Sequence, residues 1–253
     1  MNKKKVVRFI LTYILSGISF FLLTMPFHKI FAVFTVSEVR PSAVLYPLLG
    51  TCFGWSSALG IMTANAISDI MNGYTPALIT EGLVLQLLYA IVPYYLWKKL
   101  TKGESHRHRL DSISRILKYV AVCFIFSVLS AVGVGALIYL NYHTNPMQAA
   151  LFVLLNNFDI SVILGCPLMV ISNQIISRHS GTKRVITSEE RIIIITAIAQ
   201  IIVMTGVMAI IYSSDKTIGT YSIWNSIYII ELVFINLSML ISLAFMMRFR
   251  KKA

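Results

Sequence analysis

The chain has 253 residues, of which 57% are hydrophobic and only 13% are charged. Soluble proteins contain about 45–50% apolar and about 25% charged residues, so this composition excludes a water-soluble globule. The mean hydropathy is +0.77, and long apolar runs recur along the sequence, as in proteins whose helices span membranes. The sequence therefore predicts an all-α, polytopic integral membrane helix bundle, with residues 1–253 forming a single domain.

The formal net charge of +12 comes from basic residues in short clusters. Nineteen of the 22 Lys and Arg residues lie in four clusters that alternate with apolar segments. Multi-spanning proteins place such clusters in the cytoplasm, where they face anionic lipid headgroups. The pattern favours contact with membrane lipids and argues against binding of nucleic acid. The clusters are Lys3 to Arg8, Lys98 to Lys118, Arg178 to Arg191 and Arg248 to Lys252.

The apolar pattern predicts about eight transmembrane helices. A count of eight places all four basic clusters on one side, so both termini are expected in the cytoplasm. Local signals support several of the starts. Thr75-Pro76 and Asn145-Pro146 each set a capping side chain before a proline at the first helical position. The predicted helices cover about 6–34, 41–53, 55–72, 76–97, 115–140, 146–176, 189–213 and 221–247.

Residues 41–72 admit one helix or two. A single helix of about 32 residues would be about 48 Å long, which exceeds a hydrocarbon core of about 30 Å. We therefore predict a short helical hairpin that turns near residues 50–54 inside the protein. Irregular backbone at that depth is tolerated only where protein or a water-filled cavity surrounds it. The hairpin is thus a first indication of a functional site.

Acidic side chains inside the spans are the next indication, since an ionised acid at the bilayer centre costs about 2.5–3.5 kcal/mol on insertion scales. Helix rise places Arg40, Asp69 and Glu81 at similar depth near the outer surface, in consecutive segments. Two interpretations remain open there: an outward-facing polar pocket, or a structural pair of Arg40 with one carboxylate. The acids that lie beyond the first turn of a predicted span are Asp69, Glu81, Asp159 and Glu231.

The helix at 55–72 carries two distinct faces. Gly60, Ala64 and Ser68 form a small-residue stripe that would let another helix approach closely. Asn65 and Asp69, four residues apart, form a separate polar face that is the better candidate for a site.

A deeper polar cluster lies in the helix at 146–176, where Asn157 and Asp159 precede Gly165-Cys166-Pro167. Proline at that position is expected to kink the helix and to free a carbonyl group. The cluster would either line a cavity or join helices by hydrogen bonds. We found no nucleotide-binding glycine loop, metal-ligand cluster or catalytic triad spacing. We therefore expect no enzymatic activity, no cofactor and no metal site.

Residues 36–69 carry an Arg-Pro pair, a further proline, a Gly-x-x-x-Gly turn and a small-residue helix ending in Asn and Asp. This stretch resembles the substrate-binding S components of bacterial energy-coupling-factor vitamin transporters, in which a similar hairpin helps to cover an extracellular pocket. It also resembles the eight-span membrane sensor domains of bacterial histidine kinases, diguanylate cyclases and serine phosphatases. The resemblance implies a multi-pass protein of the bacterial plasma membrane.

Two functions follow as hypotheses. The chain is a small-solute-binding membrane subunit of a transporter, with separate ATPase subunits as partners, or a stand-alone sensor or scaffold that signals to a partner protein through its cytoplasmic loops. The first is favoured because we expect no output domain after Arg248. Its candidate substrate-binding residues are Arg40, Asn65, Asp69, Glu81, Asn157 and Asp159.

Overall fold

The computed structural model describes residues 3–25, 32–34, 37–38, 41–102, 109–143 and 145–179, and also residues 191, 193–195 and 198. They belong to two compact units, one of residues 1–108 and 117–165 and the other of residues 109–116 and 166–253. Arg40 and nearly all of the predicted helices at 189–213 and 221–247 lie outside the described residues. The count of eight spans and the location of the termini therefore stay predictions.

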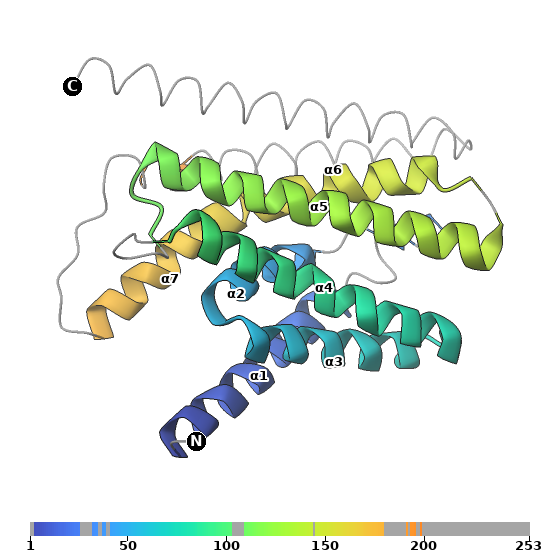
Figure 1. Cartoon of the computed structure of the whole chain (residues 1–253), viewed down its shortest axis with the longest axis horizontal. Helices are drawn as coiled ribbons and strands as arrows, with labels where there is room; N and C mark the ends of the chain where they lie inside the picture. Colours follow the sequence, from blue (N-terminus) through green and yellow to red (C-terminus); the bar gives the residue numbers. More distant parts are fainter. Residues whose placement is uncertain are drawn as a thin grey trace. The chain divides into compact units, whose positions relative to one another are not determined.

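The described part of the chain is helical apart from one small β hairpin (Figure 1). The hairpin pairs two very short antiparallel strands. In chain order the elements are α1 (Lys3–Thr24), β1 (Ala32–Phe34), β2 (Ser37–Glu38), the 3-10 helix η1 (Pro41–Val44), α2 (Leu45–Phe53), α3 (Trp55–Met71), α4 (Pro76–Leu100), α5 (Ile113–Tyr142), α6 (Met147–Ile163) and α7 (Gly165–His179).

Four helical segments are long and apolar enough to cross a membrane, namely α1, α4, α5 and Met147–Ser172, which covers α6 and the start of α7. The 22 residues of α1 correspond to about 33 Å at 1.5 Å per residue, close to the thickness of a hydrocarbon core. Large apolar side chains of α1 are exposed, as in Leu15 and Leu22 at 62% and 63%. By length and composition, these four segments suggest a helical membrane protein.

The predicted first helix at 6–34 is wrong at its carboxyl end. Helix α1 ends at Thr24, and β1 begins at Ala32. Pro26 supplies the physical reason, because the ring of a proline disfavours helical backbone at the residue before it and removes an N–H donor. The apolar run continues past this point, so hydropathy alone could not show where the helix ends.

Residues 41–72 form two helices, as predicted, and the chain turns between them at Gly54. Gly54 has φ of 62°, a conformation that glycine adopts without the steric cost of a Cβ atom. The hydroxyl of Ser57 in α3 donates to the carbonyl oxygens of Leu49 and Gly54, both at 2.9 Å. These bonds tie the start of α3 to the end of α2 and so fix the turn.

The small-residue stripe of α3 packs against α1, which confirms the packing predicted for it. A Cβ atom on Gly60 would collide with the backbone of Tyr13, and one on Gly17 would lie 3.1 Å from the carbonyl oxygen of Gly60. Farther along α3, the hydroxyl of Ser68 donates to the sulfur of Met25 at 3.3 Å. Because glycine has only a hydrogen atom in place of a side chain, the two backbones can approach closely.

Helix α2 makes an equally close contact with α4. A Cβ atom on Gly50 would collide with the carbonyl oxygen of Ala90 and would lie 3.6 Å from the side chain of Pro93. The hairpin of α2 and α3 contacts α1 through α3 and contacts α4 through both of its helices. Figure 1 shows α3 and α4 running side by side.

An aromatic cluster joins four helices of the first unit. Tyr46 stacks on Phe126 with ring centroids 5.2 Å apart, and it meets Phe20 edge-on at 5.3 Å. Tyr89 contacts both Tyr46 and Phe126 edge-on. Such pairs contribute about 0.5–1.5 kcal/mol each beyond the area that they bury. The cluster therefore locks α1, α2, α4 and α5 together.

The predicted helix at 146–176 is divided in the structure into α6 and α7. Helix α6 ends at Ile163, and Leu164 separates it from α7. Pro167 lies four residues after Ile163, and a proline ring clashes with the carbonyl four residues before it. The interruption therefore falls where the sequence predicted a kink.

In the second unit, Arg115 pairs with Asp111 at 2.6 Å.

Replacing Gly60 by alanine should lower the free energy of unfolding by about 1–3 kcal/mol, because the added methyl group would overpack the contact with Tyr13. Reversible unfolding in mixed micelles measures the change. Gly135→Ala is the matched control, since its Cβ atom would meet Ala150 and Pro146 at 3.5 and 3.7 Å, which is ordinary contact. Equal effects of the two substitutions would contradict the close packing of α1 on α3.

Candidate functional site: a cavity beside the helical hairpin

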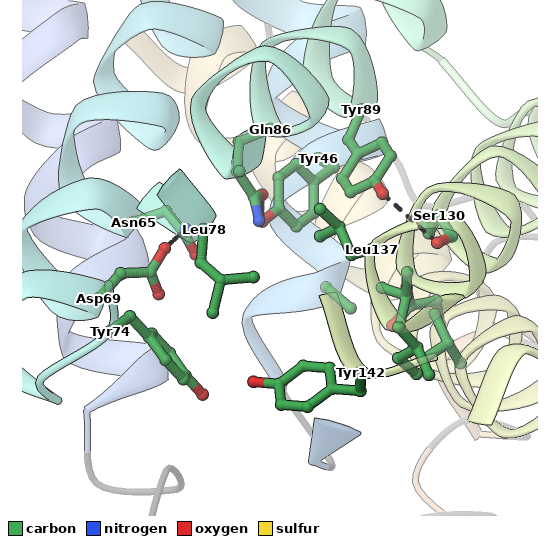
Figure 2. A pocket seen from close by; sticks show the side chains of 16 residues that line it. Tyr46, Asn65, Asp69, Tyr74, Leu78, Gln86, Tyr89, Ser130, Leu137 and Tyr142 are labelled. Atoms are coloured by element: carbon green, nitrogen blue, oxygen red, sulfur yellow. Dashed lines mark hydrogen bonds between the residues drawn. The ribbon is translucent and has the colours of Figure 1, made fainter. Parts of the chain in front are cut away.

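A partly open cavity of about 140 Å³ lies within the first unit, lined by residues of η1, α2, α3, α4, α5 and α6 and by Tyr74, which lies in the turn after α3. Figure 2 shows the side chains that surround it. Ala43 at the start of the hairpin and Asp69 near its end both line the cavity. The two ends of the hairpin therefore meet at one site because the chain reverses at Gly54.

The wall supplied by α3 is polar and buried. Asn65 is 2% exposed and Asp69 is 8% exposed, and the side-chain Nδ2 of Asn65 donates to Oδ2 of Asp69 at 2.6 Å. The two residues are one helical turn apart, so they share the face that is rotated away from the small-residue stripe. The stripe holds α3 against α1, and the polar residues, about 100° further round the helix, reach the cavity.

The wall supplied by α4 is one helical face. Leu78, Gly82, Gln86 and Tyr89 line the cavity, at the spacing of i, i+4, i+8 and i+11 that places residues on one side of a helix. The hydroxyl of Tyr46 in α2 donates to Oε1 of Gln86. This bond orients the Gln86 amide and crosses from the hairpin to α4.

The wall supplied by α5 begins at Ser130 and ends at Tyr142. The hydroxyl of Tyr89 donates to the carbonyl oxygen of Ser130 at 3.3 Å. The hydroxyl of Ser130 in turn donates to the carbonyl oxygen of Phe126 at 2.9 Å, within its own helix. These hydroxyl groups are therefore already engaged as hydrogen-bond donors within the protein.

Two tyrosines lie at one end of the cavity, near the start of α4 and the end of α5. Tyr74 lies in the turn between α3 and α4, and Tyr142 is the last residue of α5. Figure 2 shows their phenol groups extending toward one another from opposite sides. This end of the cavity is thus bordered by two aromatic rings with polar tips.

The predicted site residues do not all reach this cavity. Asn65, Asp69 and Asn157 line it, so the structure brings these three together. Arg40 lies outside the described residues. Whether the residues bind a ligand stays a prediction.

Glu81 does not line the cavity. Its Oε2 accepts a hydrogen bond from Nδ2 of Asn141 at 2.9 Å, which connects α4 to α5. Gly82, the next residue, does line the cavity, and successive residues on a helix point about 100° apart. The depth predicted for Glu81 was therefore compatible with the cavity, but its direction was not.

Asp159 does not line the cavity either, although it is completely buried, with 0% exposure. Asn156, three residues earlier on the same helix, donates through Nδ2 to Oδ1 of Asn157 at 3.4 Å. Asn157 thus connects the deeper polar cluster to the cavity wall.

The sequence analysis missed the tyrosines and Gln86. A signal was present, because Gln86 and Tyr89 continue the helical spacing set by Gly82. Tyr46 carried no such signal in its own segment, since six of the nine residues of the short α2 are buried. Its place at the cavity depends on the contact of α2 with α4.

The chemistry of the cavity comes from amide, carboxylate and phenol groups. Among the described residues that line it, none is Lys, Arg or His. Within the described part of the chain, no three His, Cys, Asp or Glu side chains come together as metal ligands would. The groups present are suited to hydrogen bonding and ring contact with a small organic molecule.

Comparisons of the chain with protein-family models, with curated proteins and with solved structures found no match.

The bond between Asn65 and Asp69 should give a measurable coupling energy. In a double-mutant cycle of Asn65→Leu and Asp69→Leu, we expect about 0.5–3 kcal/mol of coupling, the range that covers hydrogen bonds between neutral groups and those to charged groups. Reversible unfolding in mixed micelles supplies the free energies. The control cycle pairs Asn65→Leu with Asn141→Leu, which lies outside the cavity and should be additive. Additive effects of the first pair would contradict a stabilising bond.

Proposed function

We propose that this chain is a small-solute-binding membrane subunit of a bacterial transporter, similar to the S components of energy-coupling-factor transporters. The observation that carries the proposal is the partly open cavity with a buried Asn65–Asp69 pair on one wall. Buried polar groups inside a membrane protein are costly and characteristically serve a site. Helix bundles commonly hold ligands in such a cavity between facing helices.

The distribution of charge supports an outward-facing cavity. Lys98 and Lys99 lie in the last turn of α4, whereas Tyr74 precedes its first turn. By the positive-inside rule, the lysine end of α4 faces the cytoplasm of the bacterial cell. The end of the cavity bordered by Tyr74 and Tyr142 would then face the outside of the plasma membrane, where a solute is captured.

Capture would depend on the hairpin and on side chains already held in position. Asn65 and Asp69 orient one another, and Tyr46 and Gln86 do the same on the facing wall. A site that is organised before binding loses less conformational freedom when the solute enters. In this proposal the chain binds its solute without chemical conversion and works with separate ATPase subunits that supply the energy.

The principal test is stabilisation by a solute. The purified full chain in lipid nanodiscs should melt at a higher temperature with one member of a library of vitamins and other small metabolites. At a concentration of 100 times Kd, binding adds about 2.7 kcal/mol to the free energy of unfolding. Failure of every compound to shift the melting temperature would contradict the proposal. Co-purification with a kinase or phosphatase instead of ATPase subunits would favour a sensor.

Gly82→Leu supplies a variant that fills the cavity. A Cβ atom on Gly82 would lie 3.6 Å from Oδ2 of Asp69 and meet no other atom within 4 Å, and leucine favours helix more than glycine does. The variant should therefore melt at or above the temperature of the parent chain and lose the shift caused by a solute. Val84→Leu, at an exposed position of the same helix, should keep that shift.

The proposed orientation is tested separately by labelling in intact spheroplasts. A membrane-impermeant maleimide should modify Tyr142→Cys, an exposed position at the edge of the cavity, and leave Lys98→Cys unmodified until the membrane is permeabilised. The parent chain, with Cys123 and Cys166 buried and Cys52 partly buried, controls for background labelling. The reverse pattern would show that the cavity faces the cytoplasm.

A further inference from the structure

Two side-chain amides that line the cavity, Gln86 on α4 and Asn157 on α6, are held in the same way. Oε1 of Gln86 accepts a hydrogen bond from the Tyr46 hydroxyl, and Figure 2 shows the end of the Gln86 side chain beside that phenol. Oδ1 of Asn157 accepts from Nδ2 of Asn156 at 3.4 Å. In each amide the oxygen is bonded to the protein, so the nitrogen is the end that can bond to a ligand.

The nitrogens of these two amides are hydrogen-bond donors without an acceptor in the protein. An amide nitrogen carries two N–H donors, and no group in the described part of the chain accepts a hydrogen bond from Nε2 of Gln86 or from Nδ2 of Asn157. Both nitrogens are accessible, whereas Oδ1 of Asn65 is buried within the protein. The groups that a bound molecule can reach on α4 and α6 are therefore donors, and their complement is an acceptor.

The hydroxyl groups deeper in the cavity donate within the protein. The hydroxyl of Tyr89 donates to the Ser130 carbonyl, and that of Ser130 donates within its own helix. Tyr46 and Tyr89 instead offer a ligand their aromatic surfaces, with ring centroids 6.0 Å apart and the rings edge-on. The cavity thus combines aromatic rings with the amide donors of α4 and α6.

Charge and size narrow the class of ligand further. The Asp69 carboxylate lines the cavity, and none of the described lining residues is Lys, Arg or His, so a second negative charge in the same small space is unfavourable. The volume is about 140 Å³, and an apolar cavity of about 150 Å³ is known to hold benzene. The cavity therefore suits one ring with a small uncharged substituent.

We infer that the part of the solute held in this cavity is a single uncharged ring bearing a carbonyl oxygen, which accepts hydrogen bonds from the amide N–H groups of Gln86 and Asn157. This inference rests on the proposed function, since it assigns the ligand class of the same cavity. A carbonyl oxygen has two lone pairs and can accept from two donors. An analogue of the same shape without that oxygen would displace water from the amides and leave their N–H groups unpaired, so it should bind less tightly.

Three compounds of nearly equal shape test the inference. Acetophenone carries the carbonyl oxygen, α-methylstyrene replaces it by a methylene group, and benzoate has a charged carboxylate at the same position. Saturation-transfer NMR and melting curves of the full chain in nanodiscs, corrected with empty nanodiscs for uptake by lipid, should show at least tenfold tighter binding of acetophenone than of either analogue.

The outcomes separate the inference from the proposed function. Equal affinities of acetophenone and α-methylstyrene, both abolished by Gly82→Leu, would overturn the acceptor inference and leave solute binding in place. Tighter binding of benzoate would overturn the assignment of an uncharged ligand. If none of the three binds while a library compound stabilises the chain, the inference fails alone. If no library compound stabilises the chain either, the proposed function fails with it.

Substitutions at the two amides then assign the donors. Gln86→Glu keeps an oxygen for the Tyr46 hydroxyl, and Asn157→Asp keeps one for Asn156, but both replace the amide N–H groups by an acceptor. Each should lower the preference for acetophenone over α-methylstyrene at least threefold, whereas Asn141→Leu, outside the cavity, should leave it unchanged. Gln86→Met and Asn157→Leu remove the donors without adding charge and provide the comparison if the acidic variants do not fold. A preference that survives in the folded variants of one residue would overturn the assignment to that residue.

Discussion

The close backbone contacts at Gly50 and Gly60 are the constraint on which the rest of the first unit depends. Helices in lipid gain little from hydrophobic burial against one another, so their association relies on packing and hydrogen bonds. Gly60 brings α3 against α1, and Gly50 brings α2 against α4. The hairpin is thereby held through both of its helices. The turn at Gly54 can then bring the start of η1 and the end of α3 to the same cavity.

Helix α3 serves two purposes because its two faces differ in kind. One face carries Gly60 and Ser68 against α1, and the other carries Asn65 and Asp69 to the cavity. The bond between these two offsets part of the cost of burying an amide and a carboxylate. A rigid packing face on one side supports a defined polar geometry on the other.

The sequence predicted the start of a helix well where neighbouring residues determine it. Thr75 caps α4 by accepting from the N–H of Leu78, and Pro76 begins that helix. The end of α1 was mispredicted because the apolar run extends beyond Pro26, although the proline itself was the better guide. It was harder to predict which residues from different helices share a site. The depth of a residue in the membrane follows from the rise of its helix alone, but the direction of its side chain follows from the rotation of that helix. Glu81 has the predicted depth, yet its side chain pairs with Asn141 and does not line the cavity.

By itself, the sequence determined that the described chain is helical and apolar enough for a membrane, and that residues 41–72 turn back on themselves. Composition, proline and glycine act over a few residues, so those features need no knowledge of distant contacts. Only the tertiary structure decided which side chains share the cavity. Tyr46 meets Gln86, and Tyr89 meets the Ser130 carbonyl, across 40 and 41 positions of sequence. Such pairs depend on the rotation and register of whole helices, and close packing at the glycines sets both.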